Sequence, residues 1–395
     1  MDFSYTEEQS LLRDSVERYL EKNYSFEQRR TLVEGREGMS AQVWQEFANL
    51  GLLGLIASAD HGGYGGGGIE TMLVMEALGR HLVIEPYLTT AITCANLIQM
   101  AGDEAQKRIL LPQIADGSMK FALAHSERSA RFNLAYVETT AHEESGEWVI
   151  NGAKSVVQHG AVADLLIVSA RTKGKPGDAQ GLSLFFVNPA EPGVEGRDYP
   201  TYDGMRAAEV TFKNVHIGPE SVIGVLDRGF PVLEAVVDRT LAALCAEAVG
   251  CMETLNRQTL EYLKTRQQFG VPIGKFQALQ HRMVDIRIEY EMAKSMAILA
   301  AVKADSEEVV ERRRAVSAAK ERIGRAARFV GQQAIQLHGG MGMTNELPIG
   351  HYFKRLTAID TAFGNSDHHL DQFWLAQAAQ ATPVPVRLKS KWKQI

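Results

Sequence analysis

The stretch FPVLEAVVDRTLAALCAEAVGCMETLNRQTLEYLKTR, residues 230–266, decides the fold of the C-terminal part of this chain. Its apolar residues recur at helical spacing without a break, which predicts one long α-helix. Further helical patterns follow at 276–304, 309–337 and 370–381. Because loops separate these patterns, we expect antiparallel neighbours and a C-terminal four-helix bundle over residues 229–382.

The period changes upstream of this bundle. Short runs rich in β-branched and aromatic residues are separated by Gly, Pro, Asn and Asp, a pattern typical of a β-sandwich or barrel. These runs lie at 119–125, 147–151, 165–172, 182–187 and 208–212. The sequence therefore predicts a middle β domain over residues 119–228.

Residues 1–118 read as an N-terminal helical domain. Thr6 and Gln9 form a capping-box pattern ahead of the first apolar run. A glycine cluster at 61–68 lacks the preceding strand and the GxxxxGK[ST] spacing of a phosphate loop, so we interpret it as a loop before a helix. The fold class is thus α+β, and residues 383–395 form a short basic tail.

The composition excludes several classes of protein. The chain has 395 residues with 42 basic and 48 acidic side chains, a formal net charge of −6, and 45% hydrophobic residues. Such a chain does not suit nucleic-acid binding, which needs a basic surface, and no run offers the ~20 apolar residues of a membrane span. Three cysteines without CxxC spacing predict neither zinc nor a disulfide framework, and we expect no metal site. The acidic N-terminus is unlike a signal peptide, so we expect a cytoplasmic protein.

Two glycine-bearing motifs carry a resemblance to a known family. They are Thr265-Arg-Gln-Gln-Phe-Gly270 and Ala334-Ile-Gln-Leu-His-Gly-Gly-Met-Gly342. With Gly204-Met-Arg206 and Gly229-Phe230, they make nearly the whole chain resemble the acyl-CoA dehydrogenases, flavoenzymes that oxidise the α,β bond of a coenzyme A thioester. Within that family the chain resembles most the small subunits described as pimeloyl-CoA dehydrogenase.

The resemblance implies FAD, an acyl-CoA substrate, an electron-transfer acceptor and an oligomer. In the family these two motifs contact an FAD held mainly by the neighbouring subunit. Physical chemistry suits that role: a guanidinium can pair with a pyrophosphate, a phenyl ring offers a flat apolar face to an aromatic ring, and glycines let backbone N–H groups approach an anion. The predicted cofactor-binding residues are Arg266, Phe269, Gln336, Gly339 and Gly340. The alternative is that Arg266 caps its helix and the glycines only make a turn.

The catalytic carboxylate of the family is missing at both places where the resemblance puts it. The family's usual Glu, which removes the α-proton, corresponds here to Phe363. Some relatives carry the base on the first long bundle helix, at the position of Thr240, with Leu241 where an Arg often stands. Neither a phenyl ring nor a threonine hydroxyl accepts a proton at neutral pH. The catalytic residue is therefore left unassigned.

The loops that face the flavin in the family also depart from its pattern. The Thr-Glu-Pro-Gly-x-Gly-Ser-Asp run corresponds to residues 125–132, HSERSARF, which hold no glycine. Val156 stands where many relatives have an aromatic residue, and Gln158 where they have Thr. Residues that would serve a partner's FAD thus persist, whereas those that would serve this chain's own flavin do not.

Several acids and histidines are weak candidates for a displaced base. Glu247 is one acid in an apolar helix, where an intersubunit salt bridge or a helix-facing hydrogen bond is the alternative, and Asp360 flanks the lost Glu. Asp238 next to Arg239 suggests an ion pair, and Asp367-His368-His369 suggests a helix start capped by Ser366 or Asp367. His125 and His159 could face the site, although a loop histidine is usually solvated.

Three hypotheses follow. The chain could be a subunit that completes the FAD site of a catalytic sister chain in a hetero-oligomer, acting on a dicarboxylyl or bulky, ring-bearing acyl-CoA. It could be an active homo-oligomer, such as a homotetramer, with a displaced base. It could also be a non-catalytic scaffold that binds partner chains or CoA esters.

Overall fold

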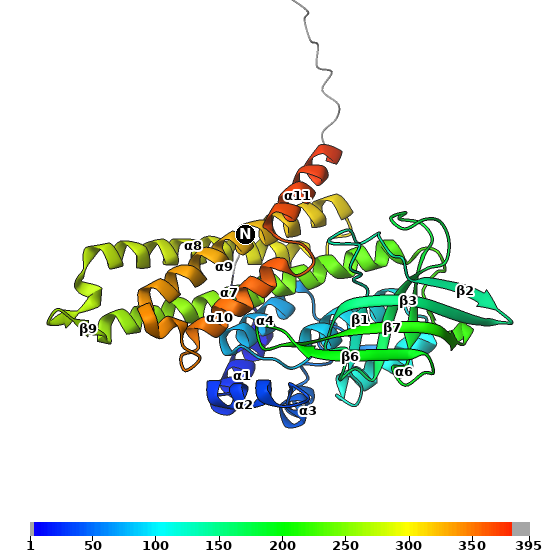
Figure 1. Ribbon diagram of the computed structural model, residues 1–395, viewed down its shortest axis with the longest axis horizontal. Coiled ribbons are helices and arrows are strands. Elements are labelled where there is room, and N and C mark those ends of the chain that lie inside the picture. Colours follow the sequence, from blue (N-terminus) through cyan, green and yellow to red (C-terminus); the bar gives the residue numbers. More distant parts are fainter. Residues whose placement is uncertain (1–3, 381–395) are drawn as a thin grey trace, which may run out of the picture.

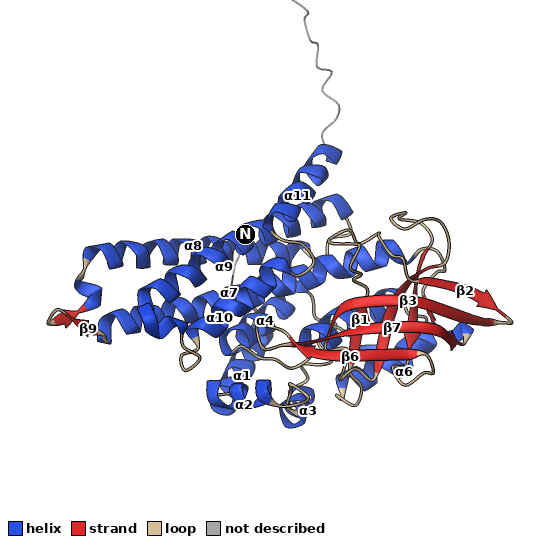
Figure 2. Cartoon of the chain, viewed as in Figure 1, coloured by secondary structure: helices blue, strands red, loops and turns tan. Residues whose placement is uncertain are grey.

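A computed structural model describes residues 4–380 and shows three regions in the predicted order: helices, a β-sheet and a second set of helices (Figures 1 and 2). The first region contains α1 (Glu7–Asn23), α2 (Phe26–Glu34), α3 (Ala41–Asn49), η1 (Ala59–His61), α4 (Gly68–His81), the π-helix η2 (Leu88–Cys94), α5 (Ala95–Ala101) and α6 (Glu104–Ala115). The basic tail beyond residue 380 lies outside the described residues.

The first helix starts where the capping box predicts. Thr6 Oγ1 accepts a hydrogen bond from the Gln9 N–H at 3.2 Å, and Gln9 Oε1 accepts one from the Thr6 N–H at 3.0 Å. The glycine cluster is a loop before α4, as expected, and close packing explains why glycine is needed at two of its positions. A Cβ at Gly63 would lie 2.2 Å from the Ala57 carbonyl oxygen, and one at Gly68 would lie 2.1 Å from that of Ala301.

The middle region is one eight-stranded sheet. Its strands are β1 (Phe121–Ala124), β2 (Thr140–Glu144), β3 (Glu147–Gln158), β4 (Leu165–Arg171), β5 (Leu182–Val187), β6 (Val194–Pro200), β7 (Arg206–Ile217) and β8 (Val222–Ile223), with η3 (Pro219–Ser221) before β8. The order is β6-β7-β3-β2-β4-β5-β8, and β1 pairs with β4 in parallel. Register shifts in the β3–β7 pair, between Lys154 and Val157 among others, bend the sheet near the end of β3.

The third region is a helical bundle. It contains α7 (Gly229–Thr265), a small hairpin of β9 (Gln267–Gln268) and β10 (Val271–Pro272), η4 (Ile273–Lys275), α8 (Gln277–Lys303), α9 (Val309–His338), η5 (Gly339–Met343), α10 (Ile349–Thr361) and α11 (Ser366–Gln380). Helices α7 and α9 pack against each other and against both α8 and α10, and α11 packs on α9. The four-helix bundle is confirmed, but its fourth member is α10, and the predicted helix at 370–381 is the peripheral α11.

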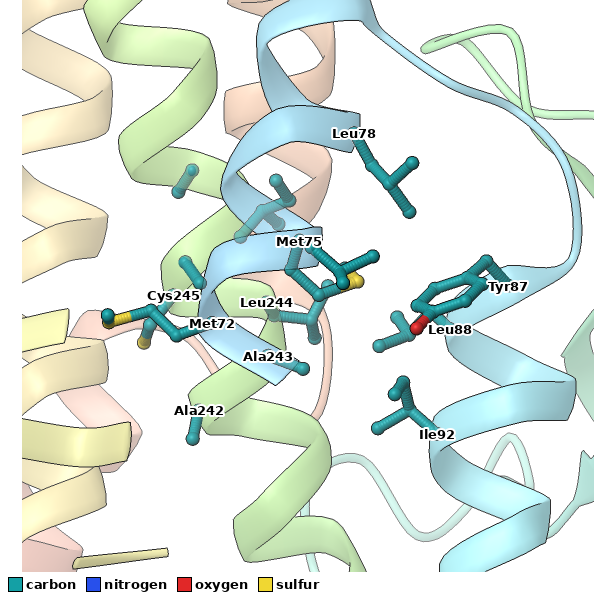
Figure 3. Packing of buried hydrophobic residues seen from close by; sticks show 14 of the residues in the cluster. Met72, Met75, Leu78, Tyr87, Leu88, Ile92, Ala242, Ala243, Leu244 and Cys245 are labelled. Atoms are coloured by element: carbon teal, nitrogen blue, oxygen red, sulfur yellow. The ribbon is translucent and has the colours of Figure 1, made fainter. Parts of the chain in front are cut away.

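The core joins the two helical regions. Side chains of α4, η2 and α7 interdigitate there, among them Met75, Tyr87, Leu88 and Leu244 (Figure 3). Gly250 lets helices α4 and α7 approach closely, because any Cβ at this position would lie 2.0 Å from the Glu76 carbonyl oxygen. The three free cysteines are buried, as the sequence suggested for the two on α7. Within residues 4–380, no helix has the length and apolar character that crossing a bilayer requires.

Among the elements that the sequence analysis did not predict are strands β2 and β6 and helix α10. Strand β6 is an exposed edge strand and β2 exposes most of its residues, so neither shows an apolar face. Helix α10 buries Ile349, Tyr352, Leu356 and Ile359, a helical spacing that was readable from the sequence.

Candidate functional site

A cavity of about 500 Å³ lies where the β domain meets the bundle. Residues of η2, the loop after β1, the end of β3, α7 and α10 line it. Both residues at the expected base positions, Thr240 and Phe363, line this same cavity, although they are far apart in the sequence. The structure therefore brings together the two positions that the resemblance singled out.

The turn that carries Phe363 is held firmly. Phe363 has a φ of 53°, an uncommon value for a residue other than glycine. The buried Lys320 ammonium donates hydrogen bonds to the carbonyl oxygens of Asp360 (2.8 Å) and Gly364 (2.7 Å), one on each side of the turn. His369 Nε2 lies 3.2 Å from the Phe363 carbonyl oxygen. The turn is ordered even though its side chain offers no base.

The Thr240 hydroxyl forms hydrogen bonds within the chain. Its hydroxyl lies 3.0 Å from that of Thr93 on η2 and donates to the Val236 carbonyl oxygen at 2.9 Å. Leu241, its neighbour, is buried in the core. Thr240 thus ties α7 to the π-helix and supplies no acid or base.

Glu247 lies in a buried ion-pair cluster and does not line the cavity. Arg355 Nε and Nη2 donate to its two carboxylate oxygens at 2.5 and 2.7 Å, and Arg355 Nη1 donates to Asp203 at 2.8 Å. Burial disfavours the Asp203 anion, but the Arg355 guanidinium outweighs this and holds the pKa of Asp203 below its usual value. Glu247 is therefore a salt-bridge residue, but its partner lies in the same chain and not, as the alternative had it, in a neighbouring subunit.

Asp360 is also engaged within the chain. Its Oδ2 accepts a hydrogen bond from Arg328 at 2.9 Å, and its Oδ1 accepts one from the Ser366 hydroxyl at 2.8 Å. Helix α11 is capped by the Asn365 side chain, which accepts from the His368 N–H at 3.0 Å, so the expected cap by Ser366 or Asp367 is wrong. Neither Asp360 nor Asp367 lines the cavity.

A buried pair that sequence reasoning missed fixes the loop at 125–139. Lys154 Nζ donates to Glu127 Oε1 at 2.7 Å and to the His125 carbonyl oxygen at 3.2 Å, and Glu127 also accepts from the N–H groups of Glu138 and Thr139. Burial lowers the pKa of Lys154 to about 8, although Glu127 opposes the shift. The signal in the sequence was a lysine inside an apolar strand.

Both histidines are buried rather than solvated, and His125 lines the first cavity whereas His159 does not. His125 Nδ1 lies 2.9 Å from the Ser169 hydroxyl, and His159 Nε2 lies 2.9 Å from the Ile84 carbonyl oxygen. Burial lowers the pKa of His125 to about 3 and that of His159 to about 4. Both are therefore neutral near pH 7.

A second cavity of about 570 Å³ adjoins the first and shares Phe363 and the loop 130–134 with it. Asp238 lines this cavity and pairs with Arg312 at 2.8 Å rather than with Arg239, which pairs with Asp305. Burial raises the pKa of Asp238 to about 6. Val156, at the expected flavin-facing position, is 53% exposed with a φ of 53° and lines the first cavity with Gln158.

The two glycine-bearing motifs meet at one end of the bundle. The Tyr262 ring stacks on that of His338, with 4.3 Å between the ring centres, and its hydroxyl donates to the His338 carbonyl oxygen at 3.4 Å. Arg266 therefore lies one helical turn beyond a residue that touches the start of the Gly339–Gly340 turn. Phe269 projects with 90% of its surface exposed.

Family models and known relatives agree along most of the chain. The acyl-CoA dehydrogenase N-terminal, middle and C-terminal domain models match residues 6–118, 122–215 and 227–374. The chain belongs to the acyl-CoA dehydrogenase family. It is 28% identical over 374 residues to isovaleryl-CoA dehydrogenase, mitochondrial, of Pongo abelii, covering 92% of this chain and 86% of that one.

Solved structures of this family share the fold. Butyryl-CoA dehydrogenase from Megasphaera elsdenii superposes with a TM-score of 0.87 at 25% identity, covering 96% of this chain and 100% of that one. A steroid ACAD variant, Tcur3481-Tcur3483, superposes with a TM-score of 0.85 at 27% identity, covering 94% and 98%. The three-region architecture is thus that of an FAD-dependent acyl-CoA dehydrogenase.

The end of the bundle fits the adenosine diphosphate half of FAD, the cofactor of this family. Phe269 offers an exposed aromatic face, and the Arg266 side chain has no hydrogen-bond or ion-pair partner within residues 4–380. A Cβ at Gly339 or Gly340 would meet nothing within 4 Å, so a ligand can approach this turn closely, although the Gly339 N–H already donates to the Gln336 carbonyl oxygen. Exposed Gln336 adds an amide. A cation, an aromatic face and a turn without side chains match a dinucleotide's pyrophosphate and base.

Proposed function

We propose that this chain is a subunit of an FAD-dependent acyl-CoA dehydrogenase that completes the FAD site of a catalytic partner and supplies no base of its own. One observation carries the proposal: Thr240 and Phe363, the two positions of the family's base, line one cavity, and neither is a carboxylate. The alternative bases Glu247 and Asp360 are held by Arg355 and by Arg328 outside that cavity.

In this proposal the end of the bundle serves the sister chain. Arg266 would bind the pyrophosphate, Phe269 would cover the adenine, and Gln336 with the turn at Gly339 and Gly340 would hydrogen-bond the rest of the dinucleotide. FAD supplies the hydride acceptor for α,β-desaturation of an acyl-CoA thioester, and the proton acceptor would come from the partner. Exposure of these residues supports an intersubunit role, because a site within the chain would bury them.

The packing of the core supports the proposal that a bulky or dicarboxylyl acyl group binds to the partner subunit and not to this chain. Next to the first cavity, the space bounded by Leu88, Glu247 and Arg355 amounts to about 20 Å³. Tyr87, Leu88 and Leu244 fill the region between η2 and α7 (Figure 3). Arg355 cannot anchor a second substrate carboxylate, because Glu247 and Asp203 already occupy its donors.

The experiment compares the chain alone with the chain coexpressed with a Glu-bearing dehydrogenase from an adjacent coding region. We expect the lone chain to lack stoichiometric FAD absorbance and the coexpressed complex to hold FAD and reduce an electron acceptor on addition of acyl-CoA. Arg266→Ala should lower the FAD content of the complex, whereas Lys213→Ala, at an exposed ion pair on the β domain, should not.

Two outcomes would refute the heteromer proposal. A lone chain that carries one FAD and bleaches it on addition of an acyl-CoA would be an active homo-oligomer with a displaced base. A complex that binds acyl-CoA but shows the same FAD content with and without this chain would assign it a scaffold role.

A further inference from the structure

The two motifs assigned to FAD lie at the ends of different helices. Arg266 follows α7, whereas Gly339 and Gly340 follow α9. Within residues 4–380, no hydrogen bond or ion pair joins the segment 265–270 to the segment 334–342. One dinucleotide can contact both motifs only if other residues fix the distance between them.

One pair of side chains connects the helix ends that carry these motifs. The Tyr262 ring on α7 stacks on the His338 ring on α9, with 4.3 Å between the ring centres and 28° between the planes. The Tyr262 hydroxyl donates to the His338 carbonyl oxygen at 3.4 Å. The Arg266 N–H donates to the Tyr262 carbonyl oxygen at 2.8 Å, and His338 directly precedes Gly339. Each ring is thus one hydrogen bond or one peptide bond away from a residue assigned to FAD.

Further contacts hold both sides of this pair. His338 is 5% exposed, and its Nδ1 lies 2.8 Å from the Ala334 carbonyl oxygen. Because a carbonyl oxygen only accepts, Nδ1 carries a proton, and burial lowers the pKa of His338, so the ring is neutral near pH 7. On the other side, the Ile273 N–H donates to the Arg266 carbonyl oxygen at 2.8 Å and closes the hairpin after α7. The stack therefore joins two ordered helix ends.

We propose that Tyr262 and His338 are positioning residues that fix the separation of the two FAD motifs, an inference that rests on the proposed function. Neither ring needs to touch FAD, because each acts through its neighbour, Arg266 or the turn at Gly339. Without the stack, the ends of α7 and α9 would move against each other, and FAD binding would have to order them. An aliphatic side chain does not replace the ring, because a stacked aromatic pair contributes more than the area it buries.

The test measures the FAD dissociation constant of the coexpressed complex after its flavin has been removed. Tyr262→Leu should weaken FAD binding about tenfold, whereas Tyr262→Phe, which keeps the ring and loses only the long hydrogen bond, should stay within about threefold of wild type. His338→Leu and His338→Phe should differ in the same direction, which tests the stack from its other side. The matched control is Tyr19→Leu, because the Tyr19 ring contacts Phe47 on the N-terminal helices, and it should leave FAD affinity unchanged.

A double-substitution cycle separates positioning from general destabilisation. If Tyr262 acts through Arg266, then Tyr262→Leu should cost less than about threefold in an Arg266→Ala background, where no guanidinium remains to be misplaced. The same factor in both backgrounds would show a structural role only and would overturn the inference. Equal affinity of Tyr262→Leu and wild type, with Arg266→Ala weakened, would overturn it as well. An Arg266→Ala complex with unchanged FAD affinity would instead refute the proposed function, on which the inference rests.

Discussion

Replacing Arg355 with methionine tests the charge cluster that joins the β domain to the helical bundle. The substitution keeps an apolar stem but removes the guanidinium that contacts Glu247 and Asp203. All three residues are at most 4% exposed, so the two carboxylates would stay buried without a counter-ion. Because these residues lie on α7, on α10 and in the loop before β7, the loss acts on the junction of the β domain with the bundle.

The expected cost follows from the burial. Removing one partner of a buried ion pair costs about 3–5 kcal/mol, and here one cation serves two anions. The entropy of unfolding is about 2.1 cal/mol/K per residue, or about 0.8 kcal/mol/K for a cooperative chain of 395 residues. A loss of about 4 kcal/mol therefore lowers the Tm by about 5 °C. Neutralising all three groups with Arg355→Met, Glu247→Gln and Asp203→Asn should recover part of this loss.

The assay is urea unfolding and calorimetry at several pH values. In the wild type the lowered pKa of Asp203 stabilises the fold above about pH 4, and this contribution is lost as the pH falls through the folded-state pKa. In Arg355→Met the unpaired carboxyl groups gain protons on acidification, so the difference from wild type should narrow below about pH 5. A matched control is Lys213→Met, whose ion pair with Glu195 is exposed and worth at most about 1 kcal/mol. If Arg355→Met loses no more free energy of unfolding at pH 7 than the control variant loses, the reasoning is refuted.

Three further predictions concern single residues. Phe363→Gln should leave the kcat of the coexpressed complex within about twofold, since Phe363 exchanges no proton; a larger loss in steady-state kinetics would return it to the catalytic machinery. Gly250→Ala should destabilise the chain by about 3 kcal/mol in urea titrations, because its Cβ would meet the Glu76 carbonyl oxygen at 2.0 Å, whereas Gly196→Ala has open space and should cost less than about 1 kcal/mol. Burial holds the pKa of His159 at about 4, so between about pH 6.5 and pH 4 only the unfolded chain gains this proton, and the free energy of unfolding falls by about 1.4 kcal/mol per pH unit. His159→Gln should remove this contribution from the pH dependence of the free energy of unfolding. An unchanged pH dependence would contradict the assignment of a neutral His159.

Much of the architecture was predictable because it rests on local periodicity. The long helices are close to their predicted bounds, since α7 runs from Gly229 to Thr265 where the pattern spans 230–266. The predicted run at 182–187 is β5, which is buried along its length. Edge strand β6 was not predictable in this way, because backbone pairing to β7 holds it and its side chains face solvent.

The candidate site was likewise predictable only in part from the sequence. Counting along the family's motifs placed Phe363 and Thr240 at the base positions, and the fold brings both to one cavity. The partners of Glu247 were beyond reach of the sequence, because Arg355 lies 108 positions away and only packing brings them together. The same is true of His125, which the fold buries against Ser169.

The sequence by itself determined the order of the regions and the absence of a carboxylate at the two positions where the family keeps its base. Helical and strand periodicity and residue identity are local properties, so they can be read without coordinates. Only the tertiary structure decided which charges are neutralised: Arg355 contacts the carboxylates of Glu247 and Asp203, and Asp238 pairs with Arg312 rather than with its sequence neighbour Arg239. Coulomb interactions and hydrogen bonds depend on distance and burial, and the chain sets both only when it folds.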